Sequence, residues 1–185
     1  MSLLPLFLDL RGKRVLVVGG GSVALAKLRA LAPTGCSVRA VSLCFTPACL
    51  EALAGFELDL QERAFQPTDL DGVHLVISAT NDPAANAQVA EQTRARGLWL
   101  NAVDDVASCD ALFPSILRRG PFVAAISTEG AFAGLSRVLR EALEALVQFR
   151  QQLKQSLPDP ERRATVLREL LRQLQQDVLP AEVHS

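Results

Sequence analysis

The chain has 185 residues, of which 49% are apolar and 21% charged, a composition typical of a packed domain with a smaller second unit. Its formal net charge is −1 at pH 7, whereas nucleic-acid-binding domains usually carry a basic excess, so we expect no nucleic-acid partner. There is no apolar run of about eighteen residues, and Pro5, Asp9 and Arg11 interrupt the apolar start. We therefore expect neither a membrane span nor a signal peptide.

The first hundred residues alternate between strand and helix patterns. Short apolar runs predict buried strands, and Ala-rich segments that end at Pro or Gly predict helices. This alternation predicts an α/β fold, a Rossmann-like parallel sheet with helices on both faces, over residues 1–113. The expected strands are 14–18, 37–42, 75–79 and 98–101, and the expected helices are 23–34 and 83–96.

The pattern changes near Pro114. A further strand is expected over 122–126, a helix over 135–157 and a last amphipathic helix over 161–178. We interpret residues 114–147 as a dimerisation region and 148–185 as a C-terminal helical region. Apolar helices attached to a small domain favour a homodimer, and the alternative is that they fold back on their own domain.

The four cysteines form no CxxC pair and have no histidine nearby. A disulfide framework or a structural zinc site is therefore less favoured than reduced thiols. We expect a cytoplasmic protein without a metal site. The cysteines are Cys36, Cys44, Cys49 and Cys109.

The segment from Gly19 to Ala24 fits the G-x-G-x-x-G/A pattern between a predicted strand and a predicted helix. Gly19 permits a tight turn, Gly21 lets the backbone approach a diphosphate, and the helix start offers free N–H groups to the phosphates. We therefore predict a dinucleotide-binding site. The alternative is a glycine-rich turn without a ligand.

Two further loops lie at the same predicted edge of the sheet. Val41-Ser42-Leu43-Cys44 lacks the acidic residue that usually binds the ribose, and the absence of an arginine there favours NAD over NADP. Thr80-Asn81-Asp82 follows the strand at 75–79. Asn81 or Asp82 can cap the next helix, and Asn81 could also line the cofactor pocket.

Asp104 and Asp105 lie just beyond the strand at 98–101, at the same edge. Because side chains alternate along an extended chain, one carboxylate can face the crevice while its neighbour points away. A partly desolvated carboxylate there is a candidate general base. The alternative is an exposed acidic turn.

Basic residues gather downstream at Arg118-Arg119, Arg137 and Arg140. They could bind carboxylates of a substrate. Equally, they could form a solvated face and pair with Glu141 and Glu144.

At this point the chain resembles the precorrin-2 dehydrogenase family, including the N-terminal part of bifunctional siroheme synthases. The resemblance covers roughly Leu3 to Leu146 and depends on an ordered series of motifs. They are Leu4-Pro5-Leu6-Phe7 with Leu10, Val17-Val18-Gly19-Gly20-Gly21 with Val23-Ala24 and Lys27, Ala79-Thr80-Asn81-Asp82 with Asn86, Asn101-Ala102-Val103-Asp104, Phe113-Pro114-Ser115-Ile116, Ser127-Thr128, and Leu139-Arg140-Glu141.

The resemblance implies NAD-dependent oxidation of precorrin-2 to sirohydrochlorin, and insertion of Fe²⁺ or Co²⁺ at the same site. It implies that Asp104 is the catalytic aspartate and that the protein is a homodimer. The implied NAD contacts are Ser22, Val23, Leu43 and Cys44, beside Gly19, Gly21, Thr80 and Asn81. The candidate substrate-binding residues are Ser127, Thr128, Arg118 and Arg137.

The chain departs from the family pattern in the loop at 129–133 and at Ala26, where an arginine is common. These positions lie on the presumed substrate side, so they bear more on metal insertion than on dehydrogenation. A fused methyltransferase domain is not expected in this chain. Two other functions are kept as alternatives, a non-catalytic dinucleotide-sensing module and a tetrapyrrole chelatase without redox activity.

Overall fold

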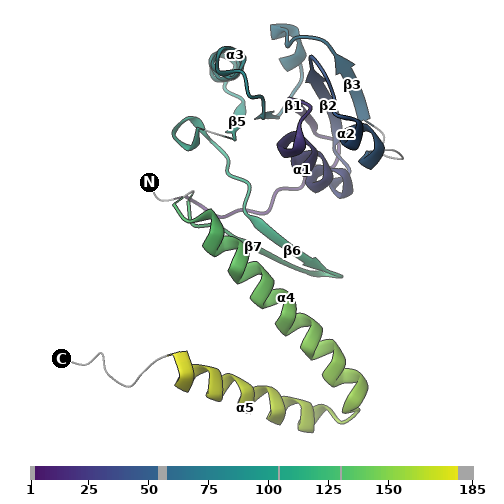
Figure 1. The fold of residues 1–185 in the computed structure, drawn as a ribbon, viewed down its shortest axis with the longest axis vertical. Coiled ribbons are helices and arrows are strands. Elements are labelled where there is room, and N and C mark those ends of the chain that lie inside the picture. The colour runs from purple at the N-terminus through teal and green to yellow at the C-terminus, as the bar shows by residue number, and fades with distance from the viewer. Residues whose placement is uncertain (1–2, 54–57, 104, 130, 179–185) are drawn as a thin grey trace, which may run out of the picture. The chain divides into compact units, whose positions relative to one another are not determined.

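A computed structural model describes residues 3–53, 58–103, 105–129 and 131–178 of the chain (Figure 1). The chain divides into two compact units, Met1–Phe113 and Pro114–Ser185. The division falls where the hydrophobic pattern of the sequence changes.

The first unit is built on a parallel five-stranded sheet with the order β3-β2-β1-β4-β5. The chain runs from β1 through β2 to β3 at one edge, then returns to add β4 and β5 on the other side of β1. The direction in which strands are added to the sheet therefore reverses between β1 and β4. Open α/β sheets bind their ligands at such a topological switch point. The strands are β1 (Arg14–Val18), β2 (Ser37–Ser42), β3 (Leu58–Glu62), β4 (Leu75–Ser78) and β5 (Trp99–Ala102).

Helices cover both faces of this sheet, which confirms the predicted fold class (Figure 1). Side chains alternate along β1: Val17 belongs to a core that also contains Leu28 of α1, and Leu16 belongs to a second core with Val89 of α3. Helix α2 contributes to the first of these cores. The helices are α1 (Ser22–Leu31), α2 (Pro47–Ala52) and α3 (Pro83–Ala95), with short 3₁₀ helices η1 (Ala32–Thr34), η2 (Pro67–Leu70) and η3 (Val106–Ser108).

Two elements of this unit, β3 and α2, are not predicted by the sequence pattern. β3 lies at the sheet edge and carries the polar residues Asp59 and Gln61, so it lacks the continuous apolar run of a buried parallel strand. α2 has only six residues, too few for a helical period to be recognised. It begins after Thr46, whose hydroxyl accepts a hydrogen bond from the Cys49 N–H at 3.2 Å.

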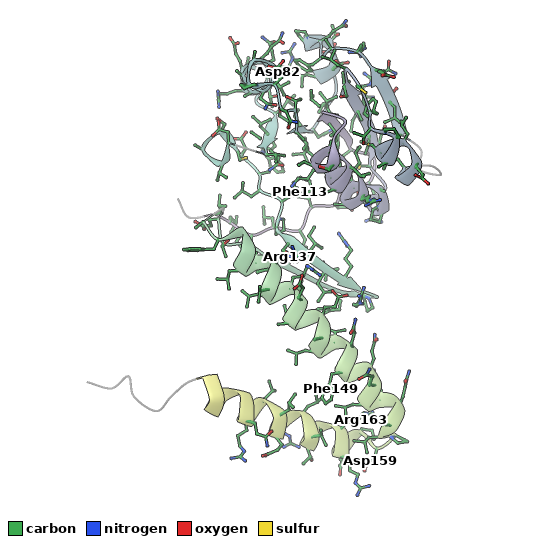
Figure 2. All side chains as sticks on the ribbon, viewed as in Figure 1. Asp82, Phe113, Arg137, Phe149, Asp159 and Arg163 are labelled. Atoms are coloured by element: carbon green, nitrogen blue, oxygen red, sulfur yellow. The ribbon has the colours of Figure 1, made fainter. Side chains whose placement is uncertain are left out.

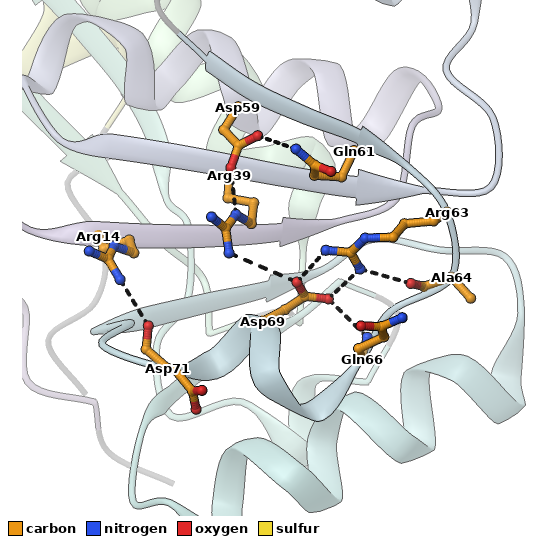
Figure 3. A network of polar contacts seen from close by, with 9 residues as sticks. All are labelled: Arg14, Arg39, Asp59, Gln61, Arg63, Ala64, Gln66, Asp69 and Asp71. Atoms are coloured by element: carbon orange, nitrogen blue, oxygen red, sulfur yellow. Dashed lines mark hydrogen bonds and ion pairs between the residues drawn. The ribbon is translucent and has the colours of Figure 1, made fainter.

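A buried carboxylate joins η2 to strand β2 and to the end of β3 (Figure 3). Asp69 is 2% exposed and accepts hydrogen bonds from Arg63 at 2.8 and 2.6 Å and from the Gln66 N–H at 2.9 Å. Arg39 lies 4.0 Å from the same carboxylate and donates to Asp59 at 2.6 Å. Burial alone would raise the pKa of Asp69, but the hydrogen bonds and the nearby arginine charges outweigh it, so this pKa lies below its usual 3.8.

Replacing Asp69 by asparagine is expected to lower the free energy of unfolding by about 3 kcal/mol at pH 7, because the arginines lose a buried partner. The lowered pKa means that the carboxylate stabilises the fold above its unfolded pKa, and that this contribution is lost as the pH falls through the folded pKa. In urea unfolding, the difference between wild type and variant should therefore shrink below about pH 4.

Asp59→Asn is the matched control for this prediction. The Arg39–Asp59 pair is 37% and 41% exposed, and such surface pairs contribute less than about 1 kcal/mol. Equal losses in the two variants would contradict a special role for the buried carboxylate.

The second unit consists of a hairpin and two long helices. Strands β6 (Ser115–Arg119) and β7 (Phe122–Ile126) are antiparallel, and helices α4 (Ala133–Ser156) and α5 (Pro160–Val178) follow them. The predictions for β7, α4 and α5 are confirmed to within a few residues, whereas β6, which ends in two arginines, is not predicted. The expected boundary between the dimerisation region and the C-terminal helical region, after residue 147, falls inside α4. The helix continues past this point because apolar residues recur at helical spacing as far as Leu153.

Several apolar side chains of helix α4 are exposed to solvent in the second unit taken by itself. Four of them are between 41% and 60% exposed: Leu135, Val138, Leu139 and Leu146. They recur at helical spacing, as in a helix that covers another surface with one face. In the part of the chain that the structure describes, no helix is long and apolar enough to cross a membrane.

Candidate functional site

The turn between β1 and α1 is so closely surrounded by backbone that it requires glycine at two positions. A Cβ on Gly19, which has φ +129°, would lie 2.2 Å from the carbonyl oxygen of Ala79. A Cβ on Gly20 would lie 2.3 Å from the carbonyl oxygen of Cys44. The loop therefore fits between the segments that follow β4 and β2 only without side chains.

Gly21 differs from these two glycines, because a Cβ there would meet nothing within 4 Å. It is the N-cap of α1 and has no side chain to cap the helix, and the first helical hydrogen bond runs from Leu25 N–H to its carbonyl at 3.0 Å. The N–H groups of the first turn are thus left without helical partners at the positive end of the helix dipole. This is an arrangement that binds the phosphates of a dinucleotide.

A cavity of about 290 Å³ lies beside this helix start, at the carboxyl ends of β1, β2 and β4. None of its lining residues is charged, so no carboxylate repels a diphosphate and no cation is present for a 2′-phosphate. The lining residues are Gly19, Gly20, Gly21, Ser22, Val23, Ser42, Cys44, Thr46, Ala79, Thr80 and Asn81.

The structure brings seven of the eight predicted cofactor residues together in this lining, and the exception is Leu43, which is 75% exposed and not part of it. Ser42 and Thr46 were missed, although they flank predicted positions and carry hydroxyl groups. The Ser42 hydroxyl donates to the carbonyl of Cys44 at 2.8 Å and so shapes the loop after β2. With no acid in the lining, hydroxyl and backbone groups are the ones available to a ribose.

Asp82, which lies at the start of helix α3 (Figure 2), is the residue that caps this helix. Its carboxylate accepts hydrogen bonds from the N–H groups of Ala84 at 2.9 Å and Ala85 at 3.3 Å. Of the two candidates for the cap, Asp82 is therefore the one in the structure, and Asn81 lines the cavity.

Asn86 fixes the turn that presents Thr80 and Asn81 to the cavity. Its side-chain oxygen accepts hydrogen bonds from the hydroxyls of Ser78 at 2.7 Å and Thr80 at 2.9 Å. Its amide donates to the carbonyl of Thr80 at 2.9 Å. One side chain of α3 thereby holds the end of β4 and the turn after it in a single conformation.

We expect Asn86→Ala to weaken NAD binding roughly tenfold, which corresponds to about 1.4 kcal/mol, because the Thr80–Asn81 turn loses its support. The same change leaves the buried Ser78 hydroxyl without its partner, which should cost about 1–3 kcal/mol of stability. Titration with NAD and urea unfolding measure the two effects. Gln88→Ala, an exposed position on the same helix, is the control; a similar loss of affinity in that variant would show that the effect is not specific to the turn.

The segment after β5 is folded back on the end of that strand. The buried Asn101 amide donates to the carbonyl of Ala111 at 2.8 Å, and the Cys109 thiol contacts the backbone N–H and carbonyl of Ala102 at 3.2 and 3.1 Å. The predicted catalytic Asp104 belongs to this segment, but it lies outside the described residues.

Asp105 is exposed and serves as the N-cap of η3, where its carboxylate accepts a hydrogen bond from the Ser108 N–H at 3.3 Å. A hydrogen bond from the Ser108 side chain is the main cause that lowers the pKa of Asp105, and the hydrogen bond from the Ser108 N–H lowers it further. A carboxylate with a lowered pKa is a weak proton acceptor at neutral pH. Asp105 therefore has a structural role as the cap of η3.

The predicted substrate-binding arginines lie in the second unit, and most of them are paired. Arg137 donates to Glu141 at 3.0 Å, and both Arg119 and Arg140 pair with Glu144. These are the ion pairs that the alternative of a paired face predicts, and substrate binding by the arginines stays a prediction. The Arg118 side chain, on β6, forms no ion pair with the residues that the structure describes.

Ser127 and Thr128 organise the turn that leads into α4. The Ser127 hydroxyl accepts a hydrogen bond from the Glu129 N–H at 3.1 Å. The Thr128 hydroxyl accepts one from the Phe132 N–H at 3.1 Å and lies 3.2 Å from the Ser136 hydroxyl. Both predicted substrate residues thus have local partners that fix their positions.

Comparison with known proteins gives consistent results. Residues 6–115 match the model of a family described as "Putative NAD(P)-binding". The chain is 40% identical over 175 residues to the siroheme synthase of Pseudomonas fluorescens (strain SBW25), an alignment that covers 88% of this chain and 38% of that protein. It is 45% identical over 148 residues to siroheme synthase 1 of Pectobacterium atrosepticum, with 80% of this chain and 31% of that protein covered.

Among solved structures, "SirC, precorrin-2 dehydrogenase" matches with a TM-score of 0.66 and 26% identity, over 91% of this chain and 89% of that one. The chain thus spans less than half the length of the siroheme synthases but nearly all of this shorter protein. The family match confirms the prediction of a dinucleotide-binding fold with NAD(P) as its cofactor.

Proposed function

The chain belongs to the NAD(P)-binding family that includes precorrin-2 dehydrogenase and siroheme synthases, and we propose that it oxidises precorrin-2 to sirohydrochlorin with NAD. The observation that carries this proposal is the glycine loop between β1 and α1. The space beside Gly21 is free, and the first N–H groups of α1 have no side-chain cap, so the loop forms a binding site for a diphosphate, which we call the cradle. The likeness to a precorrin-2 dehydrogenase over almost its whole length supports the substrate.

The residues of the cradle bind and orient the cofactor. The first-turn N–H groups of α1, which include those of Ser22 and Val23, would bind the diphosphate, and Thr80 and Asn81, which line the same cavity, would offer it polar groups. When bound, NAD supplies the hydride acceptor of the reaction.

Loss of a hydride from the tetrapyrrole must be accompanied by loss of a proton, and we assign the proton to Asp104. Its place in the sequence, two residues after the end of β5, supports this role, because open α/β sheets bind their ligands beyond the carboxyl ends of their strands. Asp105 is the poorer candidate, because the N-terminus of η3 engages its carboxylate.

We further propose that Fe²⁺ or Co²⁺ is a substrate ion of the same site, inserted into sirohydrochlorin. Metal insertion requires two pyrrole N–H protons to leave, and Asp104 would accept them. Incubation of the protein with sirohydrochlorin and either ion in the absence of NAD isolates this activity. If metallation proceeds no faster than in solutions without protein, the function reduces to dehydrogenation.

The exposed apolar residues of α4 support a homodimer, because a second copy can cover such a face. The four unpaired cysteines support a reducing compartment, the cytoplasm. The molar mass in solution, measured by light scattering, tests the dimer.

The decisive experiment follows the absorbance of NADH and of sirohydrochlorin while the protein is mixed with precorrin-2 and NAD. The proposed function requires both signals to rise together. Tight NADH binding without turnover would instead support a dinucleotide-sensing module. Metal insertion without turnover of NAD would support a chelatase without redox activity.

A further inference from the structure

Lys27, one helical turn after a residue that lines the cofactor cavity, carries a positive charge and has no acidic partner among the residues that the structure describes. It lies on α1 one turn after Val23, which lines the cavity, so the two side chains leave the helix on nearly the same side. Its ammonium nitrogen lies 4.4 Å from the centre of the Phe113 ring. It forms no ion pair with the carboxylates that the structure describes.

Packing does not explain this charge. The lysine is partly buried, and its burial lowers the pKa of the ammonium group, which means that the environment disfavours the charged form. The Phe113 ring attracts the cation but does not replace a carboxylate. An uncharged side chain of similar length, such as methionine, would fill the same space against Phe113 without desolvating a charge.

The segment after β5 also gives Lys27 no negative charge to pair with among its described residues. Cys109 is close enough for an electrostatic interaction, but burial raises the pKa of its thiol, so the thiol is neutral at pH 7. The side-chain oxygen of Asn101, in the same part of the structure, is buried and has no hydrogen-bond partner. Lys27 is thus a cation held beside neutral groups.

We propose that Lys27 binds a carboxylate of the substrate at the edge of the cofactor cavity. This inference rests on the proposed function, whose substrate is a polycarboxylate and therefore needs cations close to the hydride acceptor. Arg119, Arg137 and Arg140 are less suited, because each is already paired with a glutamate. The Phe113 ring holds the ammonium group in place, and the arriving carboxylate supplies the missing counter-charge.

The test compares Lys27→Met, which keeps the length and removes the charge, with Lys27→Arg, which keeps the charge. Lys27→Met should raise KM for precorrin-2 at least tenfold and change kcat less than threefold, with NAD affinity and thermal unfolding as in wild type. Lys27→Arg should restore most of the loss in KM. Arg29→Met removes one positive charge from an exposed position on the same helix and should behave as wild type.

A binding measurement separates this inference from the proposed reaction. Uroporphyrin, a stable tetrapyrrole with carboxylates around its whole rim, should bind wild type and Lys27→Arg but bind Lys27→Met at least tenfold more weakly, by fluorescence quenching. If wild type binds uroporphyrin in this Lys27-dependent way but does not oxidise precorrin-2, the proposed reaction fails and the carboxylate site stands. If Lys27→Met instead lowers kcat with unchanged KM and unchanged uroporphyrin binding, Lys27 acts on the proton acceptor or the cofactor, and the inference is wrong.

Discussion

Replacing Gly21 by aspartate is expected to abolish NAD binding and to leave the fold intact. The space around a Cβ at this position is open, so the free protein can accommodate the new side chain. That open space is the space a diphosphate would occupy beside the first-turn N–H groups of α1. The aspartate would fill it, place a negative charge against the phosphates and cap the helix N–H groups itself. We expect the Kd for NAD to rise by roughly 100-fold or more, about 2.7 kcal/mol.

Isothermal titration with NAD and thermal unfolding, carried out on the same samples, check both parts of this prediction. Gly20→Ala is the informative contrast, because its Cβ would lie 2.3 Å from a backbone carbonyl and the loop after β2 would have to move. That variant should lose stability as well as affinity, whereas Gly21→Asp should unfold at or slightly above the wild-type temperature. NAD affinity unchanged by Gly21→Asp would remove the diphosphate from this loop.

The cofactor loop could be predicted from the sequence because its determinants are local. Three glycines between a β-branched run and an Ala-rich helix specify a strand, a turn and a helix start within a few residues. The parallel order of the strands then brings Cys44, Thr80 and Asn81 to the same edge without further information.

Other features depend on contacts that the sequence does not reveal. The polar strand β3 is stabilised by pairing with β2 and by the Asp69 network, not by an apolar pattern of its own. The choice between Asn81 and Asp82 as helix cap depends on backbone geometry at one residue. Lys27 and Phe113 are distant in sequence, and only the packing of α1 against the segment after β5 brings them together.

The role of the arginines in the second unit is another feature that the sequence does not reveal. Their number and position suit either a site for carboxylates or a paired surface, and the sequence allows both. In the structure Arg119, Arg137 and Arg140 each lie within ion-pair distance of Glu141 or Glu144, and substrate binding by these arginines stays a prediction. The cation that we propose for a substrate carboxylate near the cofactor cavity is Lys27, which the arginine pattern does not indicate.

Asp104→Asn is expected to lower turnover of precorrin-2 by about 10²-fold or more, the usual contribution of a general base, and to leave NAD affinity unchanged. The amide keeps the size of the side chain but cannot accept a proton, so the loss should appear in kcat. Stopped assays of sirohydrochlorin formation and a parallel NAD titration measure the two quantities.

Asp105→Asn is the matched control, because an asparagine oxygen can still accept the Ser108 N–H and cap η3. Its lowered pKa already makes Asp105 a weak base, so removal of its charge should change turnover less than threefold. The two neighbouring variants differ only in which carboxylate is lost, so a shared loss of folding or cofactor binding cannot explain a difference between them. If Asp105→Asn proves to be the inactive variant and Asp104→Asn turns over like wild type, the proton goes to Asp105, and the assignment of the two adjacent acids is reversed.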